Sequence, residues 1–98
     1  KTVSKFPEVQ RDLSLILDKS TKFNEIEKIV EKNKINTIKK LQLYDIYEGK
    51  NIHKNKKAYA IRFILQDDLK TLDEKSINHT METLIESFEK ELKAQIRK

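Results

Sequence analysis

The sequence has no cysteine and no tryptophan, and it contains only one glycine and one proline. Without cysteine the chain forms no disulfide framework, thiol nucleophile or thiolate metal site, a composition that is consistent with a reducing cytosol. One glycine is too few for the phosphate-binding loops of Rossmann and P-loop proteins. No apolar run is long enough to span a bilayer, so we expect no membrane association and a cytoplasmic location.

Length and charge set broad limits on what the chain does. Its 98 residues suffice for one core, so we expect a single domain over residues 1–98. The first residue is Lys1 rather than methionine, which indicates a fragment of a longer chain. There are 21 basic and 16 acidic residues, a net charge of +5. A basic domain suits a polyanionic partner, although the lysines could equally serve only to solvate the surface.

Hydrophobic spacing near the start of the chain predicts a strand followed by a helix. Residues 9–18 alternate between apolar and polar side chains, with the leucines on the inward face. From Phe23 the apolar spacing becomes that of a helix of about three turns. The helix cap falls at Thr21 or one of its neighbours, and Asn33 and Lys34 are plausible ends.

The second half of the chain predicts two more strands, a longer helix and a short final strand. The strands cover residues 41–48 and 58–66, and a brief alternation over residues 92–97 suggests the last one. Between them, Thr71 and Glu74 match a capping box at a helix start. The inward stripe of that helix consists of Ile77, Met81, Leu84 and Phe88.

This order of elements predicts an α+β fold of the ferredoxin-like βαββαβ type. Right-handed crossovers would give a four-stranded antiparallel sheet with two helices on one face. Alternation in residues 58–66 then puts one set of side chains in the core and leaves Ala58, Ala60, Arg62 and Ile64 on the bare face. RNA-recognition modules of this architecture use the bare sheet face to bind bases.

Asp45 and Tyr47 are the candidate base-binding residues. Residues two apart in a strand share a face, so a carboxylate and an aromatic ring would stand side by side. The ring offers a stacking platform for an unpaired base, and the carboxylate can accept donors from a base edge. Strict alternation also puts Leu41 and Leu43 on this face. Either the face is apolar at one end or a bulge changes the alternation.

A basic loop follows directly after this strand. Residues 49–55 are rich in turn-forming glycine and asparagine. Phosphate contacts would therefore lie close to the base readers. The candidates for contacts with the RNA backbone or with the sheet face are Lys50, Lys54, Lys56, Lys57 and Arg62, with His53 beside them.

The sequence shows no catalytic centre. His53 and His79 are isolated, so we expect no metal site in this domain. Asp67 and Asp68 are adjacent and are more typical of a solvated turn than of an acid–base pair. The serines have no histidine partner in prospect.

Six short segments follow one another over nearly the whole chain: Phe6-Pro7, residues 11–13 (Arg-Asp-Leu), residues 44–49 (Tyr-Asp-Ile-Tyr-Glu-Gly), Lys56-Lys57, Thr71-Leu72 and residues 94–97 (Ala-Gln-Ile-Arg). Taken together, they resemble the ferredoxin-fold anticodon-binding domain of phenylalanyl-tRNA synthetase. The likeness is closest to the C-terminal end of the bacterial β subunit.

The resemblance implies that the domain grips the anticodon of phenylalanine tRNA. It implies that Tyr47 stacks on the first anticodon base, a guanine, and that Asp45 contacts that base. Many relatives carry a serine at the position of Ala58, which helps to hold the base, and that contact cannot form here. Catalysis would lie on the α subunit of an enzyme with two α and two β subunits, which uses ATP and magnesium. We expect no cofactor in this domain itself.

Two other functions compete with RNA binding. The domain could be a structural docking module that packs on other domains through Leu41, Leu43 and Ile64 on its sheet face. It could also be a small-molecule regulatory domain of the same architecture, but the sequence offers no glycine-bearing ligand loop for that role.

Overall fold

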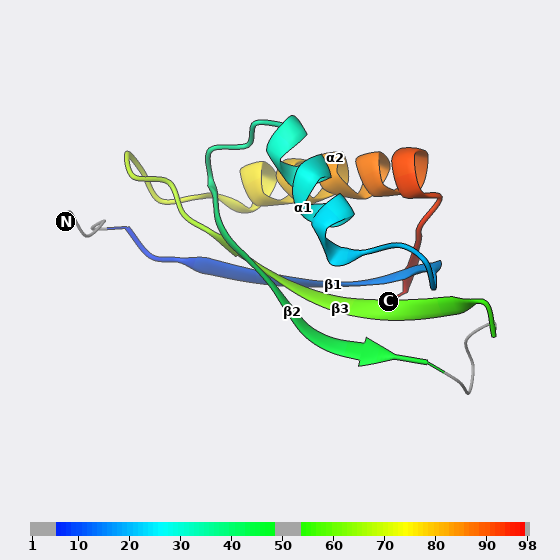
Figure 1. Cartoon of the computed structure of the whole chain (residues 1–98). Coiled ribbons are helices and arrows are strands. Elements are labelled where there is room, and N and C mark those ends of the chain that lie inside the picture. The colour runs from blue at the N-terminus through cyan, green and yellow to red at the C-terminus, as the bar shows by residue number, and fades with distance from the viewer. Residues whose placement is uncertain (1–5, 49–53, 98) are drawn as a thin grey trace.

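The computed structural model describes residues 6–48 and 54–97. The described elements are β1 (Val9–Asp18), α1 (Phe23–Lys32), β2 (Ile38–Tyr47), β3 (Lys56–Leu65), α2 (Glu74–Leu92) and β4 (Gln95–Arg97). Their strands form one sheet in the order β2-β3-β1-β4, in which every neighbouring pair is antiparallel. Both helices lie on the same face of this sheet (Figure 1). The predicted ferredoxin-like fold is confirmed.

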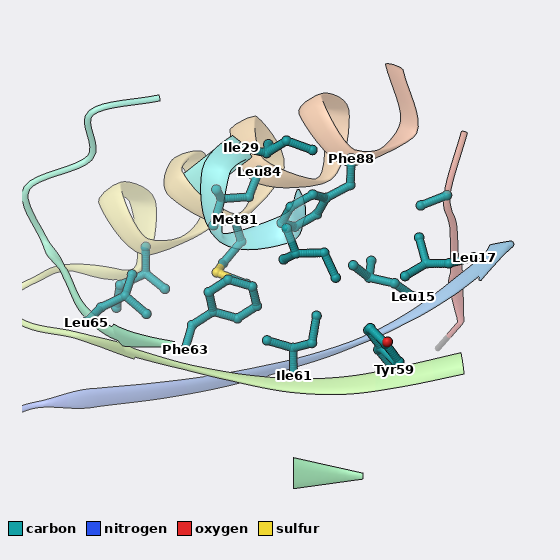
Figure 2. Packing of buried hydrophobic residues seen from close by; sticks show 13 residues of the cluster. Leu15, Leu17, Ile29, Tyr59, Ile61, Phe63, Leu65, Met81, Leu84 and Phe88 are labelled. Atoms are coloured by element: carbon teal, nitrogen blue, oxygen red, sulfur yellow. The ribbon is translucent and has the colours of Figure 1, made fainter. Parts of the chain in front are cut away.

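The two central strands, β1 and β3, line the floor of the core. They pair along their whole length, from Val9 opposite Leu65 to Asp18 opposite Lys56. Every second side chain of each strand therefore points to the helices, where it meets the predicted inward stripe of α2 (Figure 2). The largest fully buried side chains are Leu15, Leu17, Ile26, Ile61, Phe63, Leu65, Leu84 and Phe88.

The first helix begins and ends close to the predicted positions. Its N-cap is Lys22, one of the neighbours of Thr21, and the Glu25 carboxylate accepts a hydrogen bond from the Lys22 backbone N–H at 2.7 Å. Asn33 is the C-cap, and its side-chain amide donates to the Ser87 hydroxyl of α2 at 3.2 Å. This contact ties the two helices together above the sheet.

The predicted capping box of α2 is wrong. Asp73, not Thr71, is the N-cap: its Oδ1 accepts a hydrogen bond from the backbone N–H of Ser76 at 2.8 Å, and the helix begins at Glu74. The free N–H groups of a first turn are best satisfied by a side chain placed directly before it. An aspartate in that position therefore prevails over a threonine two residues farther upstream.

The last strand is shorter than the alternation over residues 92–97 suggests. The helix α2 continues through Leu92, and Lys93 then adopts a left-handed conformation with φ of 54°. Only Gln95–Arg97 pairs with β1. Ala94, between helix and strand, is 5% exposed and closes this end of the core. The predicted strand was correct only for its second half.

Candidate nucleic-acid interface

The sheet face opposite the helices is covered by none of the described elements (Figure 1). We call it the open face. Every second side chain of β3 lies in the core, so the side chains between them, Ala58, Ala60 and Arg62, point to the open face, as the sequence predicted. Ala58 is 0% exposed and Ala60 is 1% exposed, since β3 lies between two strands whose longer side chains cover the methyl groups. Small residues thus make a floor, and the accessible groups come from the flanking strands.

A bulge in β2 decides which side chains join the open face. Leu43 pairs with Ile61 and Asp45 pairs with Ala60, so Tyr44 is an extra residue in β2. The alternation changes at this point. Leu41 and Leu43 pack against the core, whereas Asp45 and Tyr47 face away from the helices.

Of the two alternatives that the sequence left open, the bulge is therefore the correct one. It also removes two of the three apolar residues, Leu41 and Leu43, on which the docking-module alternative depended.

Asp45 and Tyr47 lie next to each other above the small floor. Tyr47 is cross-strand partner to Ala58, and its side chain is 44% exposed. Asp45 is exposed, and its Oδ1 accepts a hydrogen bond from the backbone N–H of Ile46 at 2.9 Å. Its Oδ2 has no hydrogen-bond partner among residues 6–48 and 54–97. An acidic acceptor and an aromatic ring are thus presented together to solvent.

Arg62 lies one row away on the same face, held between two strands. Its Nε donates to Asp12 Oδ1 at 3.1 Å, and its guanidinium carbon lies 4.6 Å from the ring centroid of Tyr44. The hydrogen bond to Asp12 raises the pKa of the guanidinium, so Arg62 remains charged. Arg62 is therefore a fixed cation on the open face rather than a mobile one.

The predicted basic patch is divided between the two faces. Lys56 points to the open face and forms an ion pair with Asp18 at 2.6 Å, which holds the pKa of the Asp18 carboxyl below its ordinary value. Lys57 points to the helix side, where it donates to the Tyr59 hydroxyl at 2.8 Å. Lys54 is exposed in the turn before β3. Lys50, Gly49 and His53 lie outside the described residues.

The remaining polar candidates are ordinary surface groups. Asp67 accepts a hydrogen bond from the Leu69 backbone N–H at 2.8 Å, and Asp68 forms an ion pair with Lys39 at 3.1 Å. The described part of the chain has no group of three or more His, Cys, Asp or Glu side chains that could hold a metal ion. Neither described helix is long and apolar enough to cross a membrane.

Sequence reasoning missed Tyr44 as a member of the open face. Strict alternation assigns Tyr44 to the side opposite Asp45, and only the bulge brings its ring over Arg62. The available signal was the conflict in β2, where two leucines precede two polar candidates in one alternating set. Such a conflict marks a bulge somewhere in the strand, but it does not locate the extra residue.

Comparisons with known proteins find relatives that match almost the whole chain. The family model described as "Ferredoxin-fold anticodon binding domain" matches residues 4–97. The phenylalanine–tRNA ligase beta subunit of Bacteroides thetaiotaomicron is 47% identical over 97 residues, which cover 99% of this chain and 12% of that subunit. Those of Porphyromonas gingivalis and Shewanella oneidensis are 41% and 35% identical over the same shares.

The chain thus spans about an eighth of the length of these relatives, and the matched region takes in all the described elements and the whole open face. On the fold, the open sheet face and the match along almost its entire length, the chain belongs to the family of ferredoxin-fold anticodon-binding domains.

Proposed function

We propose that this domain binds the anticodon of phenylalanine tRNA and so contributes tRNA recognition to a phenylalanine–tRNA ligase. One observation carries the proposal: the bulge at Tyr44 turns Asp45 and Tyr47 together onto a solvent-facing patch above the Ala58 floor. The names of the relatives supply the tRNA and the amino acid. The side chains supply the chemistry.

The patch fits an unstacked guanine. A carboxylate has about four acceptor positions, so the bond from Ile46 leaves Asp45 able to accept both N1–H and N2–H₂ of a guanine edge. Adenine presents no pair of donors on that edge. Stacking of the base on Tyr47 contributes on the order of 1–3 kcal/mol. Asp45 would thus set specificity and Tyr47 affinity, while Ala58, which is 0% exposed, would support its cross-strand partner Tyr47 and would not contact the base.

Phosphate contacts would come from the end of the sheet beside this patch. Lys54 and Lys56 lie within a few residues of Ala58, the partner of Tyr47. Lysine–phosphate contacts release counterions, so binding is expected to weaken as salt rises. Lys57 faces the helix side and would reach the RNA only by leaving Tyr59.

The role of the whole enzyme is part of the same proposal. We propose that residues 1–98 are one domain of a longer β subunit, because the chain covers 12% of the relatives' length. That subunit would work with an α subunit, in an assembly of two copies of each, to attach phenylalanine to tRNA in the cytoplasm. ATP and magnesium would bind elsewhere in the enzyme.

A titration of the chain with the anticodon stem-loop of phenylalanine tRNA tests the proposal. Fluorescence anisotropy should show tighter binding to the natural loop than to one whose first anticodon base is changed from guanine to adenine, by about 10-fold or more. Asp45→Ala should abolish that preference. Tyr47→Ala should weaken binding to both loops by at least about 5-fold.

The matched control is Glu82→Ala, which removes an exposed carboxylate from α2 on the far side of the molecule. It should bind both loops like the unmodified chain. Equal affinity of the unmodified chain for the guanine and adenine loops would refute guanine reading.

A further inference from the structure

Tyr44 and Arg62 form a second planar surface on the open face. The Arg62 guanidinium lies over the Tyr44 ring, with its central carbon 4.6 Å from the ring centroid. Tyr44 is 45% exposed, and the Arg62 side chain is 33% exposed. An aromatic residue this exposed has part of its surface available to another flat group.

The stack is anchored across three strands. Asp12 of β1 accepts hydrogen bonds from Arg62 of β3, at 3.1 Å to Nε and 3.5 Å to Nη2, while Tyr44 projects from the bulge of β2. The ion pair orients the guanidinium, and the guanidinium supports the ring. A platform that is already ordered loses little conformational entropy when a ligand stacks on it.

The position of the stack relative to Asp45 suits a neighbouring nucleotide. Tyr47 lies opposite Ala58 and Asp45 lies opposite Ala60, while the Tyr44 ring lies over Arg62. Ala58 and Arg62 are four positions apart in β3, which is about 13 Å along the strand. Two flat platforms on either side of one base-edge acceptor match the way open sheets hold two splayed bases of a single strand.

We propose that Tyr44 and Arg62 form a second base platform, which stacks the nucleotide next to the one read by Asp45. This inference rests on the proposed function, because the ligand is the same RNA loop. The platform takes any base, since every base has a flat face and stacking on that face does not depend on sequence. It adds affinity and fixes the direction of the strand across the sheet, but it reads no further sequence.

A site-specific fluorescence experiment tests the platform. The fluorescent base 2-aminopurine replaces, in turn, the nucleotide before and the nucleotide after the first anticodon base, and the chain is added to saturation. Stacking on the platform should quench one of these two positions. Tyr44→Leu should remove that quenching and raise the Kd for the natural loop by at least about 5-fold.

Matched variants separate stacking from folding. Tyr44→Phe keeps the ring and should therefore keep the quenching. Tyr47→Leu should also keep the quenching when enough protein is added to saturate the RNA. Arg62→Lys keeps a cation beside Asp12 but removes the plane next to Tyr44. It should weaken binding to the natural loop and leave unchanged the binding to a loop that is abasic at the quenched position.

The proposal is overturned if neither neighbour is quenched, or if the quenching survives Tyr44→Leu. It is also overturned if Tyr44→Leu loses the guanine preference together with the quenching, because Tyr44 would then only support the bulge. These results leave guanine reading by the unmodified chain intact. Equal affinity of the unmodified chain for the guanine loop and the adenine loop is the separate result that refutes the anticodon function.

Discussion

Lys56 shows how an ion pair within the domain limits what a lysine offers to RNA. Its ammonium lies 2.6 Å from Asp18 Oδ1, and the resulting hydrogen bond is the main cause of the lowered pKa of Asp18. A phosphate that approaches Lys56 must compete with this carboxylate. The contribution of Lys56 to RNA binding is therefore smaller than a count of positive residues suggests.

Asp18→Asn should strengthen binding to the anticodon stem-loop. The substitution frees Lys56, so the slope of log Kd against log salt should steepen by about 0.7, the value for one more phosphate contact on a single strand. Anisotropy titrations over a range of salt concentrations measure this slope. Asp68→Asn is the control, because it frees Lys39 at the other end of the sheet with the same change in net charge. An equal effect of the two substitutions would show that net charge alone is responsible.

At the residue scale, the sequence predicted that Asp45 and Tyr47 share one face of the strand, but it did not predict what surrounds them. Asp45 and Tyr47 could be found because residues two apart share a face in any strand. The ion pair of Lys56 and the turning of Lys57 toward Tyr59 depend on the strand paired with β3 and on its register. Those are long-range properties, which local spacing does not contain.

Among the elements, α2 gives a clear test of which residue starts a helix. Asp73→Ala removes the carboxylate that accepts from Ser76, so the midpoint of thermal unfolding should fall by several degrees. Thr71→Val should leave it nearly unchanged, because Thr71 is exposed and lies outside the helix. Circular dichroism at 222 nm measures both. If Thr71→Val lowered the unfolding midpoint more than Asp73→Ala does, the result would support Thr71 as the cap, against the structure.

The same cap should make α2 sensitive to acid. The hydrogen bond from the Ser76 backbone lowers the pKa of Asp73 from its ordinary value of 3.8. Because the folded-state pKa is depressed, the stabilisation is complete above the unfolded value and is lost as the pH falls through the folded one. The difference between the unmodified chain and Asp73→Ala should stay constant from neutral pH down to about 5 and shrink below about 4.

Element types were predictable and element boundaries were less so. The stripe of Ile77, Met81, Leu84 and Phe88 is buried as its spacing indicated, because a helix with one apolar side has one way to face a sheet. The start of that helix was ambiguous, since two polar residues near it have capping side chains. Tertiary packing also extended β2 back to Ile38, beyond the predicted start at residue 41.

For the molecule as a whole, the core and the open face depend on the same strands. Phe63 is fully buried beneath the helices, and its neighbour Arg62 points to the other face. Phe63→Ala should cost about 3–5 kcal/mol of unfolding free energy, a large share of the 5–15 kcal/mol typical of a small domain. Urea denaturation gives this value, and Leu69→Ala is the control because Leu69 is 87% exposed.

RNA binding by Phe63→Ala should fall only in proportion to the fraction that unfolds. Normal binding per folded molecule would show that the open face keeps its shape despite the cavity. Weaker binding by a fully folded variant would contradict that expectation and would link core packing directly to the position of Asp45.

The extra residue at Tyr44 divides the stretch of β2 from Leu41 to Tyr47 into two halves of opposite parity. In this stretch the odd-numbered side chains face the helices up to Leu43, and the odd-numbered side chains face solvent from Asp45 onward. A chain that lacked Tyr44 would alternate without interruption and would still send Asp45 and Tyr47 outward. Any other single-residue insertion or deletion between Leu41 and Tyr47 that kept the bulge in place would exchange core for surface. In relatives of this domain, alignment gaps within the stretch that corresponds to Leu41 to Tyr47 should therefore fall at the position of Tyr44 before they fall anywhere else in that stretch.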